Sequence, residues 1–133
     1  MTGMDTTAKK ECFAAAHPRG LRTDADTTRK LKRFWNIPNG PAGAYNTDPL
    51  ITRIDDTAFV NQMIDDITSK FRIDQDRIYA TGLSNGGVLS HELACQLSDR
   101  IAAIASVSGP YWRYPQKCQP QPAVPVMYIH GTA

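Results

Sequence analysis

The hexapeptide at residues 82–87, GLSNGG, constrains the fold of this chain more than any other segment. It follows a short apolar run at residues 77–81, which predicts a strand, and it precedes apolar residues at helical spacing: Val88, Leu89, Leu93 and Leu97. A strand that turns directly into a helix holds the residue between them, Ser84, in a strained conformation. We expect Gly82 and Gly86 to be glycines because a Cβ atom would crowd such a turn. The G-x-S-x-G pattern in this context is typical of a turn that exposes a serine hydroxyl at the end of a strand.

Composition limits the size of the fold and the class of partner. A chain of 133 residues with 41% apolar residues suffices for one compact domain. The net charge is only +2, and the one dense basic cluster, Arg29, Lys30, Lys32 and Arg33, fits a solvated surface better than a nucleic-acid or membrane site. No apolar stretch approaches the ~20 residues of a membrane-spanning helix, and the first 33 residues lack the apolar core of a signal peptide. We therefore expect no nucleic-acid partner and no membrane span.

The three cysteines leave their redox state open at this stage. A bridge between Cys95 and Cys118 is geometrically conceivable, and two separate reduced thiols are equally compatible with the sequence. Cys12 has no evident partner. No pair of cysteines has C-x-x-C spacing, so we expect no metal site and no cofactor.

The order of predicted elements indicates an α/β fold. Residues 1–33 lack periodicity and are predicted to be irregular or disordered, with no strand expected before residue 77. Residues 34–133 are predicted to form the domain: a proline- and glycine-rich loop to residue 49, then a helix capped by Asp55 or Asp56 and running to about Phe71. Strands are expected at residues 77–81, 101–107 and 126–130. The fold class is therefore α/β, with three parallel strands and flanking helices around the serine turn.

Several segments match one esterase family in register. Residues 73–87 (IDQDRIYATGLSNGG) are similar to its I-D-x-x-R-V-Y-x-T-G-x-S-N-G-G run, and residues 35–36, 54–59, 93–95 and 130–132 fit further motifs. The chain thus resembles, over about a hundred residues from Trp35 onwards, the α/β-hydrolase esterases related to poly(3-hydroxybutyrate) depolymerases, feruloyl esterases and acetyl xylan esterases.

The resemblance implies a partial α/β-hydrolase fold and a serine esterase mechanism. Ser84 would be the nucleophile, the backbone N–H of Asn85 an oxyanion donor, and Gly82 and Gly86 the glycines of the nucleophile elbow. The substrate would be a small or polymeric carboxylic ester of polyhydroxyalkanoate, feruloyl or acetyl-sugar type. The family's location would be extracellular or periplasmic.

The chain departs from the family pattern in the remaining catalytic parts. The family's H-G turn before the elbow is absent, its catalytic acid would be the residue after Ala133, and its histidine would come later still. His17, His91 and His130 do not fit the general base by order or spacing. A catalytically incomplete fragment is therefore the alternative reading, and a peptidase or thioesterase with the same elbow is a weaker one.

Two aromatic residues after the second strand of the sheet are candidates for the substrate pocket. Tyr111 and Trp112 follow that strand on its carboxyl side, where open α/β sheets bind ligands. Packing of a proline-rich loop onto the domain explains the same residues equally well.

Overall fold

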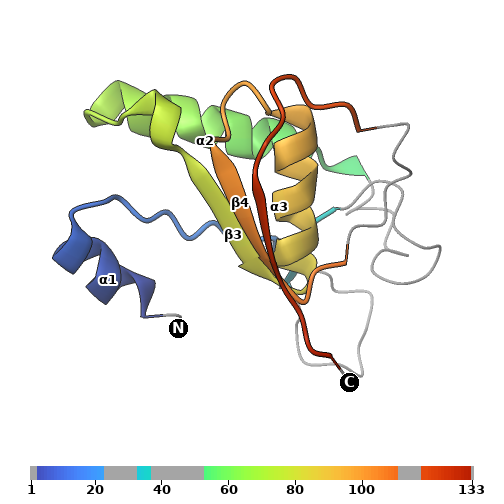
Figure 1. Ribbon diagram of the computed structural model, residues 1–133. Coiled ribbons are helices and arrows are strands. Elements are labelled where there is room, and N and C mark those ends of the chain that lie inside the picture. Colours follow the sequence, from blue (N-terminus) through green and yellow to red (C-terminus); the bar gives the residue numbers. More distant parts are fainter. Residues whose placement is uncertain (1–2, 23–32, 37–52, 111–117, 133) are drawn as a thin grey trace.

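The computed structural model describes residues 3–22, 33–36, 53–110 and 118–132 (Figure 1). The elements are α1 (Met4–Glu11), β1 (Leu21–Arg22), β2 (Arg33–Phe34), α2 (Asp56–Lys70), the 3-10 helix η2 (Gln75–Arg77), β3 (Tyr79–Leu83), α3 (Asn85–Gln96), β4 (Ala103–Val107) and β5 (Val126–Ile129).

The main sheet has three parallel strands in the order β3-β4-β5, and α3 connects the first two. The register pairs Leu83 with Val107, and Val107 with Ile129, so the three strands end level with one another. The predicted fold class, three parallel strands with flanking helices in a partial α/β arrangement, is confirmed.

One face of this sheet packs against the helices. The buried apolar cluster draws on α2, α3, β4 and the segment before β4, through Val60, Ile64, Leu89, Leu93, Ala94, Ile101 and Ile104. Along β4, Ile104 and Ser106 face this core, and alternate residues face away from it. The helices therefore share one core on one side of the sheet, as Figure 1 shows for α3.

The other face of the sheet is exposed in the described part of the chain. Tyr79 and Leu83 on β3 and Met127 on β5 each keep more than 60% of their surface accessible. Parallel sheets are ordinarily covered on both faces. The described elements thus form a parallel sheet that has helices packed on one face.

The helix α2 starts where the capping argument places it. The Asp55 carboxylate accepts a hydrogen bond from the Ala58 N–H at 2.8 Å, and the helix ends at Lys70. The strand β3 starts two residues later than expected, because the Asp74 carboxylate accepts from the Asp76 N–H and holds residues 75–77 in η2.

The N-terminal segment is more regular than its sequence predicts. Met4–Glu11 forms α1, which corrects the expectation of an irregular segment there. Its polar sequence lacks apolar periodicity, but Asp5 in the first turn and Lys9 and Lys10 in the last suit the helix dipole. The strands β1 and β2 pair antiparallel, which corrects the expectation of no strand before residue 77. The division into residues 1–33 and 34–133 stays a prediction.

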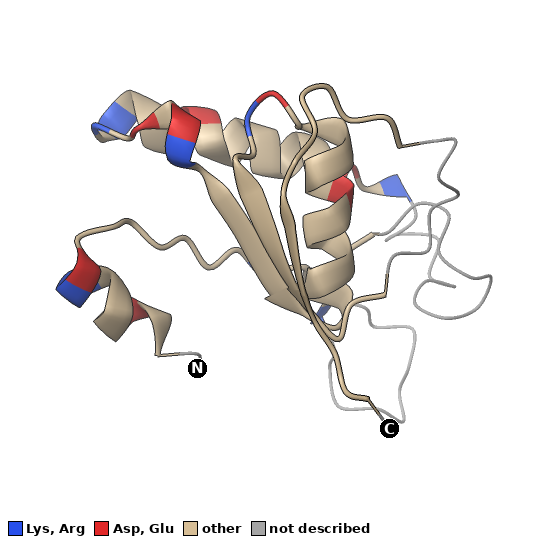
Figure 2. Ribbon diagram, in the orientation of Figure 1, with Lys and Arg blue, Asp and Glu red and all other residues tan. Residues whose placement is uncertain are grey.

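Charged side chains lie mainly on the helices and connections (Figure 2). The strands β3, β4 and β5 carry no Lys, Arg, Asp or Glu. In the predicted basic cluster only Arg33 is described, where its guanidinium donates to the Gly20 carbonyl at 3.3 Å, and the other three residues lie outside the described ranges. Among the helices in those ranges, none combines the length and the apolar character needed to cross a bilayer.

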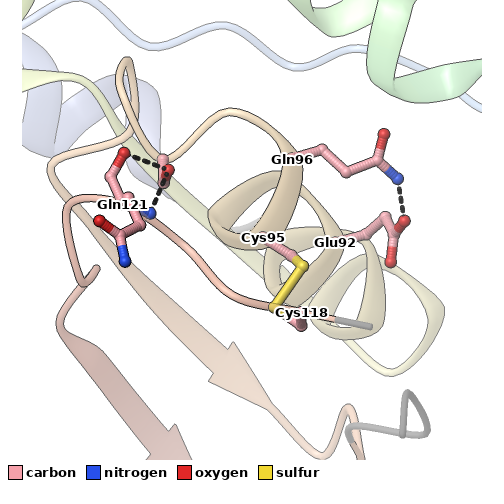
Figure 3. Close-up of a disulfide and its surroundings, with 6 residues drawn as sticks. Glu92, Cys95, Gln96, Cys118 and Gln121 are labelled. Atoms are coloured by element: carbon pink, nitrogen blue, oxygen red, sulfur yellow. Dashed lines mark hydrogen bonds between the residues drawn. A yellow bond between two sulfur atoms is a disulfide. The ribbon is translucent and has the colours of Figure 1, made fainter. Parts of the chain in front are cut away.

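A disulfide joins Cys95 on α3 to Cys118 (Figure 3). The sequence left open whether these two cysteines form a bridge or stay reduced, and the structure shows the bridge. The two Cα atoms lie 5.4 Å apart, within the usual range for a disulfide. Close by, the Ser98 hydroxyl donates to the Gln121 carbonyl and accepts from the Gln121 N–H, each at 3.1 Å. These contacts fasten the segment that leads into β5 to the end of α3.

Candidate functional site

The serine turn has the strained geometry that the sequence predicts. β3 ends at Leu83, α3 begins at Asn85, and Ser84 between them has φ 54° and ψ −117°. Positive φ is costly for a residue with a side chain. Ser84 is exposed, at the carboxyl edge of the sheet.

The two elbow glycines have different reasons to be glycine. A Cβ atom on Gly82 would lie 2.3 Å from the carbonyl carbon of Gly86, so that position tolerates no side chain. A Cβ on Gly86 would meet nothing within 4 Å. The expected clash is thus present for Gly82 and absent for Gly86. The helix backbone at Gly86 lies close to Gly82 on β3, whereas a Cβ atom on Gly86 itself would point into open space.

A second close approach, which sequence reasoning missed, fixes the start of α3 against the end of β4. A Cβ on Gly109 would lie 2.6 Å from the Cα of Gly87, and a Cβ on Gly87 would lie 2.7 Å from the Ser106 Oγ. The available signal was the pair of glycines themselves, one after the elbow and one just after a predicted strand.

Asn85 begins α3, so its backbone N–H belongs to the first turn of the helix. The first helical hydrogen bond runs from Val88 N–H to the Ser84 carbonyl at 3.0 Å. N–H groups before this point have no partner within the helix and carry the positive end of its dipole. Such a helix start favours a developing negative charge beside Ser84.

The Asn85 side chain makes a contact that sequence reasoning missed. Its Oδ1 accepts from the backbone N–H of Trp35 at 2.7 Å, and its Nδ2 donates to the Trp35 carbonyl at 3.3 Å. Both polar groups of Trp35's backbone are therefore satisfied by one amide. The Trp35 ring stacks on Phe59 of α2, with centroids 6.4 Å apart.

Asn36 continues this connection to the start of α2. Its backbone N–H donates to the Asp56 carboxylate, and its Nδ2 donates to the Ile54 carbonyl at 2.6 Å. Burial raises the pKa of Asp56 above its usual value of 3.8; the Asn36 N–H opposes this shift and the neighbouring Asp55 charge adds to it. Residues 35–36 thus link the elbow to α2.

The three histidines contact other parts of the chain. The His17 Nε2 lies 2.9 Å from the Asp5 carboxylate, and the His130 Nδ1 lies 2.9 Å from the Gly131 carbonyl oxygen. His91 packs its ring 6.0 Å from that of Tyr128, and burial lowers its pKa. His130 follows β5, two strand spacings or about 10 Å from the β3 end that carries Ser84.

The predicted substrate-pocket residues, Tyr111 and Trp112, lie outside the described residues, so their role stays a prediction. Among the residues that the structure describes, no group of three or more His, Cys, Asp or Glu side chains is placed to hold a metal ion.

The chain is similar to parts of curated esterases. It is 39% identical to feruloyl esterase B of Piromyces equi over 109 residues, which is 74% of this chain and 19% of that protein. It is 37% identical to the bifunctional acetylxylan esterase/xylanase XynS20E of Neocallimastix patriciarum over 131 residues, 98% of this chain and 16% of that protein. It is 34% identical to feruloyl esterase C of Emericella nidulans over 73 residues, 54% of this chain and 25% of that protein.

These similarities agree with the expected esterase resemblance, since each of the three proteins is named an esterase. They relate the chain to feruloyl and acetylxylan esterases and do not single out poly(3-hydroxybutyrate) depolymerases. The chain spans only about a fifth of the length of the curated relatives it matches. No family model and no solved structure matches the chain.

Proposed function

We propose that this chain carries the nucleophile of a serine esterase, with Ser84 attacking the carbonyl carbon of a carboxylic ester. The observation that carries the proposal is the conformation of Ser84: exposed, at positive φ, between a parallel strand and the first turn of a helix. The hydroxyl would add to the ester and release the alcohol, leaving an acyl-Ser84 that water then hydrolyses.

The start of α3 would hold the negative oxygen that forms during this attack. The Asn85 N–H is the proposed donor, and the Asn85 side chain fixes that residue by its two bonds to Trp35. A base must take the Ser84 proton.

The relatives' names support a proposal for the substrate class. We propose feruloyl or acetyl-sugar esters, because the matched proteins are named feruloyl and acetylxylan esterases. The residues directly after β3, β4 and β5 (Ser84, Ser108–Pro110 and His130–Thr132) include no Lys, Arg, Asp or Glu, which suits an uncharged ester. The polyhydroxyalkanoate substrate type stays a prediction from the sequence resemblance.

We also propose that the protein works in an oxidising compartment, extracellular or periplasmic. Disulfides such as Cys95–Cys118 form and persist there and are rare in the cytosol.

A second candidate is a chain that keeps the elbow scaffold without turnover. The contact made by His130 favours it, because its Nδ1 lies 2.9 Å from the Gly131 carbonyl oxygen, at a strand end two strands away from that of Ser84. Loss of triad members lowers turnover by about 10⁴- to 10⁶-fold.

Hydrolysis of methyl ferulate and p-nitrophenyl acetate tests the proposal, in both the 133-residue chain and the complete reading frame that contains it. Ser84→Ala should abolish the activity, and Ser69→Ala, an exposed serine on α2, should leave it unchanged. Activity confined to the complete reading frame would favour the scaffold reading of this chain. Activity that survives Ser84→Ala would overturn the proposed nucleophile.

A further inference from the structure

Three residues form one row across the carboxyl edge of the sheet. Ser84, Ser108 and His130 each follow the last residue of a strand, and those last residues are in register. The Ser84 N–H donates to the Val107 carbonyl and the Ser108 N–H donates to the Ile129 carbonyl, both at 2.8 Å. The ladder therefore continues one residue past the strands and places Ser108 beside Ser84, where Figure 1 shows the strand ends and the start of α3 together.

Ser108 shares the unusual backbone of Ser84. Its φ is 48°, against 54° for Ser84, and both residues are exposed. Glycine accepts such a φ without strain, yet both positions carry a hydroxyl. A strained residue with a side chain at an active-site edge motivates a functional hypothesis for that side chain.

The turn around Ser108 is fixed by buried contacts. The Ser106 hydroxyl, fully buried, donates to the Gly109 carbonyl at 3.0 Å, and Gly109 packs against Gly87 at the start of α3. The helix that follows Ser84 and the turn that holds Ser108 thus lie against each other. The position of Ser108 relative to Ser84 is set by the backbone.

We propose that Ser108 contacts the substrate: its hydroxyl hydrogen-bonds an oxygen atom of the ester bound at Ser84, on the side towards β5. This rests on the proposed function. Neighbouring strands lie about 4.8 Å apart, a separation that a bound ester group spans. A serine hydroxyl both donates and accepts, so it suits the carbonyl, alkoxy or hydroxyl oxygens of feruloyl and acetyl-sugar esters.

Ser108→Gly separates this contact from a purely structural role. Glycine adopts a positive φ without strain, so the midpoint of urea unfolding should rise. The value of kcat/KM for methyl ferulate in the complete protein should fall about 3- to 10-fold, which is the effect of losing one neutral hydrogen bond. Cys12→Gly is the matched control, because Cys12 is exposed at φ 57° at the end of α1. It should raise the midpoint without changing hydrolysis.

Binding to an inactive protein makes the test independent of turnover. In a Ser84→Ala background, Ser108→Gly should weaken methyl ferulate binding, measured by calorimetry, by the same 3- to 10-fold. Unchanged binding, or no detectable binding of the ester to the Ser84→Ala protein, would overturn the contact. Weaker binding in a protein whose wild type hydrolyses no ester would uphold the contact and refute the proposed function.

Discussion

The side chain of Asn85 pairs with the backbone of Trp35, fifty positions earlier in the chain, through hydrogen bonds of 2.7 and 3.3 Å. One residue starts the helix of the serine turn, and the other stacks on α2. The pair therefore connects the serine turn to α2 by way of Trp35.

Asn85→Ala should lower the free energy of unfolding by about 1–3 kcal/mol, because the half-buried N–H and carbonyl of Trp35 lose their partners. Asn85→Asp keeps the acceptor and loses the donor, so its loss should be intermediate. Urea unfolding followed by tryptophan fluorescence measures both. Gln62→Ala, at an exposed position of α2, is the control and should change stability by less than about 0.5 kcal/mol. An Asn85→Ala loss no larger than this control would contradict the pairing.

The two elbow glycines should respond differently to alanine. Gly82→Ala forces a Cβ to 2.3 Å from the Gly86 carbonyl carbon, and we expect a loss above about 2 kcal/mol or failure to fold. Gly86→Ala meets open space in a helix and should be neutral or stabilising by up to about 1 kcal/mol. Thermal and urea unfolding of the two variants decide this, and equal losses would refute the asymmetry.

Asp56 should make stability depend on pH. Its native pKa is raised by burial, so the native state holds the proton more tightly than the unfolded chain does. The resulting stabilisation is fully present below the ordinary pKa of 3.8 and is lost as pH rises through the raised native value. Asp56→Asn keeps an oxygen for the Asn36 N–H and removes the titration.

The free energy of unfolding of Asp56→Asn relative to wild type should therefore increase as pH rises above about 4. Urea unfolding from pH 3.5 to 7 at constant salt gives this difference. A difference that is constant with pH, or that falls, would contradict the buried-carboxylate account.

The disulfide should leave one thiol accessible. Alkylation of the native, unreduced protein should modify Cys12 alone, and Cys12→Ser should abolish the modification. Closing a loop of 23 residues contributes about 3 kcal/mol in the chain-entropy model. Cys95→Ser combined with Cys118→Ser should lose about that much, and modification of three thiols without reductant would exclude the bridge.

Local signals in the sequence predicted most of the regular core. A cap at Asp55 or Asp56 and the apolar periodicity predicted α2, and the strand-turn-helix context predicted the strained Ser84. Each of these depends on residues close together in the chain. The helix α1 was missed because it has no apolar stripe, and its charge pattern was the weaker signal.

Long-range geometry could not be read from the same signals. The Asn85–Trp35 pairing joins two segments whose motifs the sequence shows separately, and no spacing rule relates them. The level ends of the strands, which bring Ser108 beside Ser84, depend on the register of the sheet. Register is set by packing across the whole layer, so it appears only in the folded chain.

Covalent labelling of Ser84 tests the central claim most directly. The complete protein would be treated with a fluorophosphonate, digested and mapped by mass spectrometry, with Ser84→Ala and Ser69→Ala treated in parallel. We predict a single adduct on the peptide that contains Ser84, retained in Ser69→Ala and absent from Ser84→Ala. A folded protein that takes up no adduct, or one that is labelled equally after Ser84→Ala, would contradict the account.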